Sequence, residues 1–276
     1  MKTVAFFDSK SYDKESFKKL VGEDINIRFF ENKLNADTVS MAACCDAVCV
    51  FVNDNVDKYV LEQLEKYGVG LVALRCSGYN NVDLKAASGS VKVVRVPAYS
   101  PFAIAEHAIG MILLLNRKLH KAYIRTRDHN FSLEGLIGFD LKDKTVGIIG
   151  TGKIGIKFAN ICKGFGMNIL GYDPYENKDF CGKYVSLDEI LSCSDIISLH
   201  CPLTKENRHL INNETIEKMK KGVYVINTSR GQLINTQSLI NGLKSGKIGA
   251  AGLDVYEEET ALFFEDYSDE VIHDDT

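Results

Sequence analysis

The chain has 276 residues, which is enough for one large domain or two ordinary ones. Its formal net charge of −4 gives no indication of the excess of basic residues that is typical of nucleic-acid-binding proteins. No apolar run approaches the length of a membrane span. The first residues lack the apolar core and cleavage site of a signal peptide, and the eight cysteines show no C-x-x-C pair and no zinc spacing. We therefore expect a cytoplasmic protein with reduced thiols and no metal, which binds neither nucleic acid nor a membrane.

The first part of the chain alternates between two kinds of apolar pattern. Short apolar runs typical of strands lie at 2–7, 26–30, 47–52, 69–74 and 92–96. Helical patterns separate them, at 12–20, 36–43, 57–67 and 82–87. Strands that alternate with helices predict a parallel sheet that is covered on both faces.

A segment with a proline near each end, 96–101, follows this block and predicts a crossing between two domains. We place the first domain at 1–100 and the second at 101–276. The second domain is expected to open with one long helix over 102–126, which is rich in Ala, Ile, Leu and Met. Further strands are predicted at 145–149, 168–172, 195–199, 223–227 and 248–253, with helices between them.

The strongest single signal is a glycine-rich turn between the strand at 145–149 and a helical pattern. Its glycines are Gly150, Gly152 and Gly155, and Asp173 ends the next strand 18 residues after the last of them. The first glycine permits a tight turn, the second admits a pyrophosphate close to the backbone, and the third lets the helix pack against the sheet. The pyrophosphate would then meet free N–H groups at the helix N-terminus. The pattern predicts a Rossmann domain that binds NAD.

Polar clusters follow other strands, where parallel sheets of this kind bind their ligands. Taken singly, Arg230 could be a surface cation, Glu259 part of a solvated acidic run, and Asp254 the end of a turn. Their convergence on the cofactor edge favours a function. An arginine can hold a carboxylate through two parallel hydrogen bonds, and a glutamate can orient a proton-transferring histidine. The clusters are 74–83, 198–204, 226–231 and 252–257, the last followed by Glu259.

Over its whole length the chain resembles the NAD-dependent D-2-hydroxyacid dehydrogenases, and within them it is most similar to the bacterial fermentative D-lactate dehydrogenases. The resemblance implies a flavodoxin-like substrate domain and a Rossmann NAD-binding domain with a doubly wound parallel sheet. The implied reaction is reversible reduction of pyruvate, or a similar 2-oxo acid, to the D-2-hydroxy acid. The stretches that carry the resemblance are 75–83, 96–101, 105–108, 150–155, 200–204, 227–231 and 254–257.

The resemblance also implies roles for individual residues. Arg230 would be the catalytic arginine that holds the substrate, and Glu259 would pair with the catalytic histidine. Ser77 and Gly78 would offer N–H groups to the substrate carboxylate, and Tyr99 would border the pocket. The NAD site would be lined by Gly150, Gly152, Lys153, Ile154, Gly155, Asp173, Cys201, Pro202, Asn207, Thr228, Ser229, Arg230 and Asp254.

One departure from the family's pattern concerns the end of the chain. The family's catalytic histidine lies several tens of residues beyond its glutamate, whereas Thr276 is only 17 residues beyond Glu259. His273 is the one histidine downstream, and its acidic surroundings predict a surface position. We therefore expect a chain cut before its catalytic histidine, with an incomplete second domain. The first domain would then lack its usual returning C-terminal helix.

Three matters stay open on the sequence. The substrate could be a larger 2-oxo acid, with a branched or phenyl side chain. The chain could instead be an NAD-binding regulatory module, because the related C-terminal-binding corepressors share this fold. The family usually forms dimers through the Rossmann domain, so we expect a homodimer or a higher homo-oligomer, with the helix from 102 as its interface.

Overall fold

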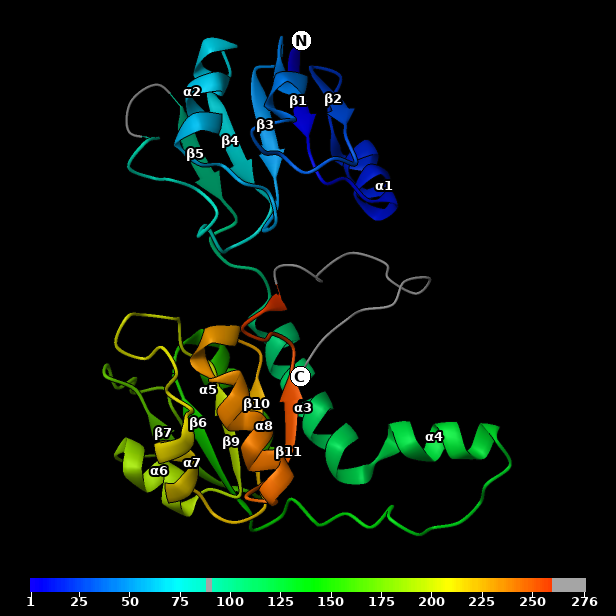
Figure 1. Ribbon diagram of the computed structural model, residues 1–276, viewed down its shortest axis with the longest axis vertical. Coiled ribbons are helices and arrows are strands. Elements are labelled where there is room, and N and C mark those ends of the chain that lie inside the picture. Colours follow the sequence, from blue (N-terminus) through cyan, green and yellow to red (C-terminus); the bar gives the residue numbers. More distant parts are fainter. Residues whose placement is uncertain (88–90, 260–276) are drawn as a thin grey trace. The chain divides into compact units, whose positions relative to one another are not determined.

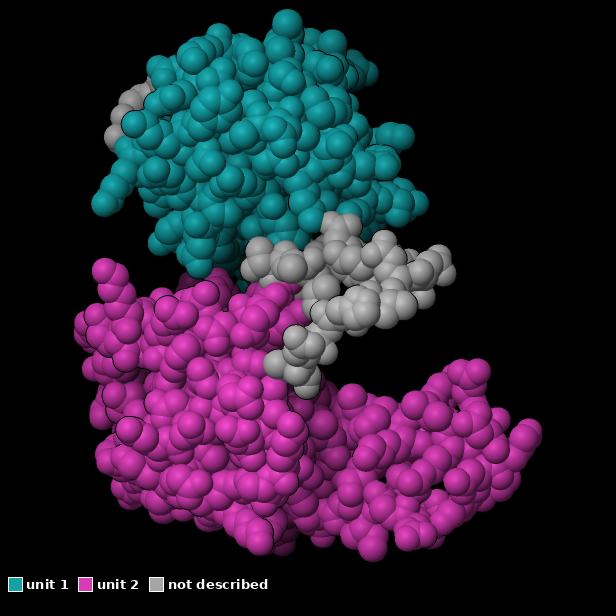
Figure 2. Space-filling view, in the orientation of Figure 1, with its two compact units in different colours: residues 1–99 teal, residues 100–276 magenta. Residues whose placement is uncertain are grey.

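The computed structural model describes residues 1–87 and 91–259. The chain divides into two compact units, 1–99 and 100–276, which are coloured separately in Figure 2. His273, which the sequence predicts to lie at the surface, falls outside the described residues. Within those residues no helix is both long and apolar enough to cross a membrane.

The first unit is built on one five-stranded sheet (Figure 1). All of its strand pairs are parallel, and the order β2-β1-β3-β4-β5 is that of flavodoxin-like folds. Its strands are β1 (Lys2–Phe6), β2 (Ile25–Phe29), β3 (Ala47–Val50), β4 (Leu71–Leu74) and β5 (Lys92–Arg95). Its helices are α1 (Ser11–Leu20), η1 (Val39–Ala42) and α2 (Lys58–Lys66).

The core of the first unit explains why these runs become buried strands. All four residues of β3 are buried, as a central parallel strand requires. On one face, Val60 and Leu64 of α2 pack against the sheet and are fully buried. On the other face, Phe17 of α1 meets the ring of Phe6 edge-on, with 4.9 Å between the ring centroids.

The second unit contains a six-stranded parallel sheet in the order β11-β10-β9-β6-β7-β8. This is the Rossmann order, in which the direction of winding reverses between β6 and β9. Ligands bind at such a reversal, outside the carboxyl ends of the strands. The strands are β6 (Thr145–Ile149), β7 (Asn168–Tyr172), β8 (Lys183–Tyr184), β9 (Ile196–Leu199), β10 (Val223–Asn227) and β11 (Ile248–Leu253).

Helices cover both faces of this sheet, so the doubly wound architecture predicted from the sequence is confirmed. Ala105 and Ile112 of α3 and Phe158 of α5 enclose one core, whereas Leu191 of α6 and Leu239 of α8 enclose the other. The helices are α3 (Pro101–Arg117), α4 (Leu119–Arg127), α5 (Lys153–Gly164), α6 (Leu187–Cys193), α7 (Asn213–Lys218), η2 (Gly231–Leu233) and α8 (Thr236–Ser245).

The long helix predicted over 102–126 is wrong, because the helix breaks at Lys118. This residue has φ +51° in the left-handed region and separates α3 from α4. The buried Asn116 side chain, just before the break, bonds the backbone of Phe139 at both its N–H and its carbonyl, at 2.9 and 2.7 Å. α4 then projects away from the sheet and buries none of its residues (Figure 1).

Two predicted helices of the first unit do not form as α-helices. Over 36–43 only the short 3-10 turn η1 appears, because Asn35 accepts the N–H groups of Asp37 and Thr38 and closes the chain locally. Over 82–87 the chain turns instead, since Val82 forms a bridge with Val56 and leaves too few residues for a helix.

Apolar or helical patterns around Cys44, Cys45, Cys49, Cys162 and Cys193 predict core thiols, and that prediction is right for some of these cysteines and wrong for others. Cys45, Cys49 and Cys162 are buried, whereas Cys44 and Cys193 are exposed. All eight cysteines lie in the described part of the chain, and all are free.

Candidate active site

The glycine turn joins β6 to α5 at the point where the sheet reverses. Gly150 has φ +96°, and a Cβ there would lie 2.6 Å from the backbone nitrogen of Cys201. A Cβ on Gly155 would collide with the Gly150 carbonyl oxygen, so only glycine lets α5 start this close to the turn. A Cβ on Gly152 would meet nothing within 4 Å, which leaves open space over the start of α5.

That open space lies over the first N–H groups of α5, which have no carbonyl partner within the helix. α5 begins at Lys153, and among the described residues no side-chain hydrogen bond caps its N-terminus. Asp173, just after β7, accepts hydrogen bonds from the backbone N–H groups of Thr151 and Tyr175 at 2.7 and 2.9 Å. The carboxylate is therefore held beside the turn, with lone pairs to spare for further donors.

The loop after β9 approaches the turn from the next strand. His200 is half-buried, with its Nε2 atom 2.9 Å from the Ser198 hydroxyl and its ring against Phe158. Burial lowers the pKa of His200 to about 3, which favours the neutral form of the ring. Beyond it, the Asn207 amide donates to the Pro202 carbonyl at 2.8 Å and shapes the loop.

The loop after β10 is closed by Asn227. Its amide donates to the Arg230 carbonyl at 2.9 Å, and its side-chain oxygen accepts the Ser229 N–H at 3.0 Å. The Ser229 hydroxyl donates to the Cys201 carbonyl at 2.7 Å and ties the β9 and β10 loops together. The Thr228 hydroxyl is buried without a hydrogen-bond partner among the described residues, so it is available to a ligand.

Three charged side chains gather beyond β10 and β11. Arg230 is exposed, and its guanidinium donates to the Ser229 carbonyl at 2.6 Å. Burial raises the pKa of Glu259, and the charge of Asp254 raises it further. The Tyr256 N–H, which donates to Glu259 at 2.8 Å, and the charge of Arg230 oppose that rise. A carboxyl with a raised pKa beside an arginine suits proton transfer.

The structure adds contacts that the sequence-based expectations missed. The Nε2 atom of His107, on α3, lies 3.4 Å from Asp254, although 105–108 was among the stretches that carried the resemblance. Glu257 accepts a 2.7 Å bond from His209 and a 3.2 Å bond from Arg208, so the acidic run is not simply solvated. These two bonds lower the pKa of Glu257 even though its burial acts in the opposite direction.

In the first unit, the expected substrate residues lie after β4 and β5. Ser77 is held by Arg95, which donates to its carbonyl at 2.8 Å and to its hydroxyl at 3.1 Å. Gly78 follows, with its carbonyl accepting from the Cys76 thiol at 3.3 Å. Tyr99 is exposed at the end of the unit.

Comparison with known proteins agrees with this geometry. A doubly wound sheet with a glycine turn and a strand-end acid defines an NAD-binding dehydrogenase domain. Residues 109–270 match the model of the D-isomer specific 2-hydroxyacid dehydrogenase, NAD binding domain. The chain belongs to the D-isomer specific 2-hydroxyacid dehydrogenases.

Individual relatives support the same assignment. A 2-hydroxyacid dehydrogenase homolog of Haemophilus influenzae is 56% identical and D-lactate dehydrogenase of Escherichia coli is 54% identical, each over 99% of this chain and 84% of the relative. The structure of D-lactate dehydrogenase from Aquifex aeolicus, complexed with NAD and lactic acid, is 34% identical with a TM-score of 0.85. That match covers 98% of this chain and 82% of the other. The predictions of an oxidoreductase and of NAD as cofactor are confirmed, and they exclude the regulatory module as the main interpretation.

Proposed function

We propose that this enzyme reversibly reduces pyruvate with NADH to D-lactate. The observation that carries the proposal is the gathering of Arg230, Asp254 and Glu259 at the edge of the sheet that binds NAD. The relatives named D-lactate dehydrogenase support pyruvate as the substrate over a larger 2-oxo acid.

The proposed roles follow from the chemistry of each group. The cofactor supplies a hydride to the keto carbon. Arg230 binds the carboxylate and polarises the keto oxygen through its planar fork of donors. The first unit serves as the substrate domain, in which the N–H groups of Ser77 and Gly78 receive the carboxylate and Tyr99 borders the pocket. Glu259 orients the histidine that the family places after it, and that imidazole donates the proton.

We propose that NAD lies over the start of α5, with its pyrophosphate at Gly152 and its adenosine ribose at Asp173. The buried Thr228 hydroxyl supplies a further polar contact. Asp173 would repel a 2′-phosphate, so NADH should bind more tightly than NADPH, which a fluorescence titration with both cofactors tests. The proposed site comprises Gly150, Gly152, Lys153, Ile154, Gly155, Asp173, Cys201, Pro202, Asn207, Thr228, Ser229, Arg230 and Asp254.

A kinetic panel tests the reaction. NADH oxidation is measured with pyruvate, 2-oxoisocaproate and phenylpyruvate, and the reverse reaction is measured with D-lactate and L-lactate. We expect the highest kcat/KM with pyruvate and NAD reduction with D-lactate alone. A preference for either larger acid would contradict the proposed substrate, and oxidation of L-lactate would contradict the proposed stereochemistry.

We also propose that the protein is a cytoplasmic homodimer. The free state of all eight cysteines supports a reducing compartment. The projecting helix α4 and the segment after it support the dimer, since their apolar side chains are exposed on the unit and could be covered by a second copy. These side chains are Leu119, Tyr123, Ile124, Phe131, Leu133 and Ile137.

Light scattering on the eluted protein tests the dimer. The wild type should have the mass of two chains, and Ile124→Glu should shift it toward one. Tyr12→Glu is the matched control, because Tyr12 is also an exposed apolar residue but lies on α1 of the first unit. A monomeric wild type would contradict the proposed dimer.

A further inference from the structure

Arg75 joins the ends of three neighbouring strands in the first unit. It follows β4 directly, and its backbone N–H donates to the Val50 carbonyl at the end of β3, at 3.0 Å. Its side chain then crosses the end of β3 and donates to the carbonyls of Phe7 and Asp8, just after β1, at 3.1 and 2.6 Å. Because β3 lies between β4 and β1 in the sheet, a single side chain spans all three strand ends.

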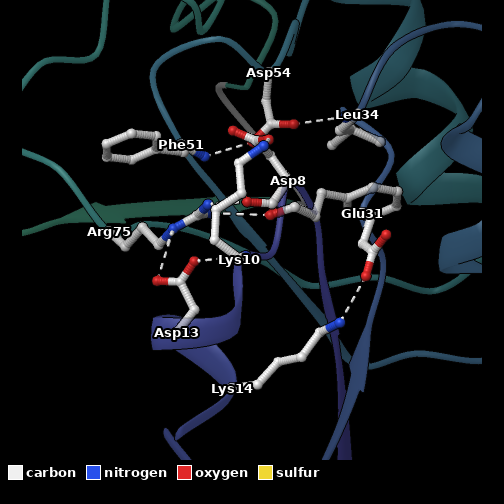
Figure 3. Close-up of polar contacts among 10 residues, drawn as sticks. Asp8, Lys10, Asp13, Lys14, Glu31, Leu34, Phe51, Asp54 and Arg75 are labelled. Atoms are coloured by element: carbon white, nitrogen blue, oxygen red, sulfur yellow. Dashed lines mark hydrogen bonds and ion pairs between the residues drawn. The ribbon is translucent and has the colours of Figure 1, made fainter. Parts of the chain in front are cut away.

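The guanidinium lies over two aromatic rings and is paired at its edge with Asp13, a contact drawn in Figure 3. Its carbon lies 4.6 Å from the ring centroid of Phe6 and 4.7 Å from that of Phe51, and its Nε atom is 3.8 Å from Asp13. The side chain is only 12% exposed. A planar fork that stacks on two rings and bonds two carbonyls cannot be reproduced by the single ammonium group of lysine.

A second contact fixes the other end of the same loop. The Asn81 amide donates to the carbonyls of Phe51 and Asp54, both at 2.8 Å, and so joins the loop after β4 to the loop after β3. Asp54 is 2% exposed, and its carboxyl group accepts the N–H groups of Leu34 and Phe51. The bonds of Asp54 therefore fix the loop after β3 at the place where Asn81 binds it.

Segment 76–80 lies between these two anchors and contains Ser77 and Gly78. We propose that Arg75 and Asn81 are positioning residues, which fix this segment so that its N–H groups hold the substrate carboxylate in the alignment that hydride transfer needs. The inference rests on the proposed function, from which it takes the role of Ser77 and Gly78. Neither side chain has to touch the substrate, because displacing a binding group by about 1 Å can cost on the order of 10²-fold in rate.

The test compares Arg75→Lys and Asn81→Ala with a matched control, Arg28→Lys. Arg28 also donates to a backbone carbonyl, that of Ala43 at 3.4 Å, and lies 5.3 Å from the ring centroid of Phe30, but it is on β2. In both test variants we expect the KM for pyruvate to rise about tenfold or more, with a smaller fall in kcat. The Kd for NADH should stay within about twofold of the wild-type value, since the cofactor residues are in the other unit.

Hydrogen exchange over 76–80 is measured on the same proteins and does not depend on activity. Faster exchange together with a raised KM in both variants, and neither change in Arg28→Lys, is the expected result. A lowered melting temperature with an unchanged KM would overturn the proposal, because Arg75 and Asn81 would then be structural residues only. An equal rise in KM in the Arg28→Lys control would also overturn it. A wild-type protein that turns over no 2-oxo acid, whatever its exchange, would instead overturn the proposed function.

Discussion

The ability of Arg230 to bind a substrate depends on the geometry of its guanidinium more than on its charge. Its guanidinium is exposed and bonded only to the carbonyl of its own neighbour Ser229 among the contacts of the described chain, so its remaining donors can face an anionic ligand. Its neighbours Asp254 and Glu259 are both acidic, so Arg230 is the cation of this cluster that can bind a substrate carboxylate. A side chain with a positive charge but without the planar set of donors of a guanidinium would bind a carboxylate less well.

Arg230→Lys should therefore behave as a severe change. Lysine retains the positive charge but cannot form two parallel bonds to a carboxylate, so we expect a large rise in the KM for pyruvate and a loss in kcat. Affinity for NADH should be nearly unchanged, which separates the substrate contact from the cofactor site. Steady-state kinetics and a fluorescence titration measure both quantities. Wild-type kinetics in this variant would mean that Arg230 faces solvent in the working enzyme.

From the buried carboxyl of Asp54 we predict a contribution to folding stability that decreases as the pH rises. Burial raises its pKa to about 6, above the ordinary 3.8, so the folded state binds more protons than the unfolded state between these values. The contribution of Asp54 to stability is therefore greatest below the lower value and is lost as the pH rises through about 6. The difference corresponds to roughly 3 kcal/mol, at about 1.36 kcal/mol per pKa unit.

Urea unfolding of the wild type and Asp54→Asn at pH 4 and pH 7 tests this prediction. The free energy of unfolding of the wild type, relative to that of the variant, should be larger at pH 4 than at pH 7. Titration of all other carboxyls is shared by both proteins and cancels in the comparison. A difference that is equal at the two pH values would contradict the raised pKa.

In the turn between β6 and α5, different glycines are needed for ligand binding and for folding. Gly152 has φ −71°, which alanine tolerates, and its Cβ would enter open space. Gly152→Ala should thus leave the melting temperature unchanged or slightly raised, while its methyl group enters the space assigned to the pyrophosphate and raises the Kd for NADH about tenfold or more. Gly164→Ala, equally open but at the other end of α5, is the control and should bind NADH normally. Gly155→Ala should lower the melting temperature, because its Cβ meets the Gly150 carbonyl.

The central strands of both sheets could be predicted from the sequence because they are buried on both faces. The continuous apolar run of β3 and the run of β6 between Thr145 and Ile149 carry that signal locally. The break at Lys118 could not be predicted, since Leu119, Tyr123 and Ile124 continue an apolar pattern. These side chains find no core within their own unit, and a sequence pattern cannot show whether an apolar face meets its own chain or another.

The same limit applies to the candidate site. Its strand-end residues could be predicted because a parallel sheet brings the carboxyl ends of its strands to one edge. The contact between His107 and Asp254 joins residues far apart in the sequence, as do the bonds from Arg208 and His209 to Glu257. The bonds that Arg75 makes to Phe7 and Asp8 belong to the same class. Such contacts depend on the packing of loops, which leaves no local periodic signal.

At the scale of the whole molecule, each unit has a hydrophobic core of its own. The core of the first unit includes Val48 and Leu64, and those of the second include Ile148 and Leu199. The glycine turn and Asp173 belong entirely to the second unit, which should therefore hold NADH with its own residues. Because the cores are separate and the proposed cofactor residues lie in the second unit, we expect NADH to stabilise the two units unequally.

Calorimetry with and without NADH tests this unequal stabilisation. A ligand present at about 100 times its Kd stabilises the unit that binds it by about 2.7 kcal/mol. We expect two unfolding transitions, of which NADH raises only the one that belongs to the second unit. Gly152→Ala, measured at the same NADH concentration, should show a much smaller shift, while Gly164→Ala should match the wild type. Equal shifts of both transitions in the wild type would show that the units unfold as one cooperative body and would contradict independent cores.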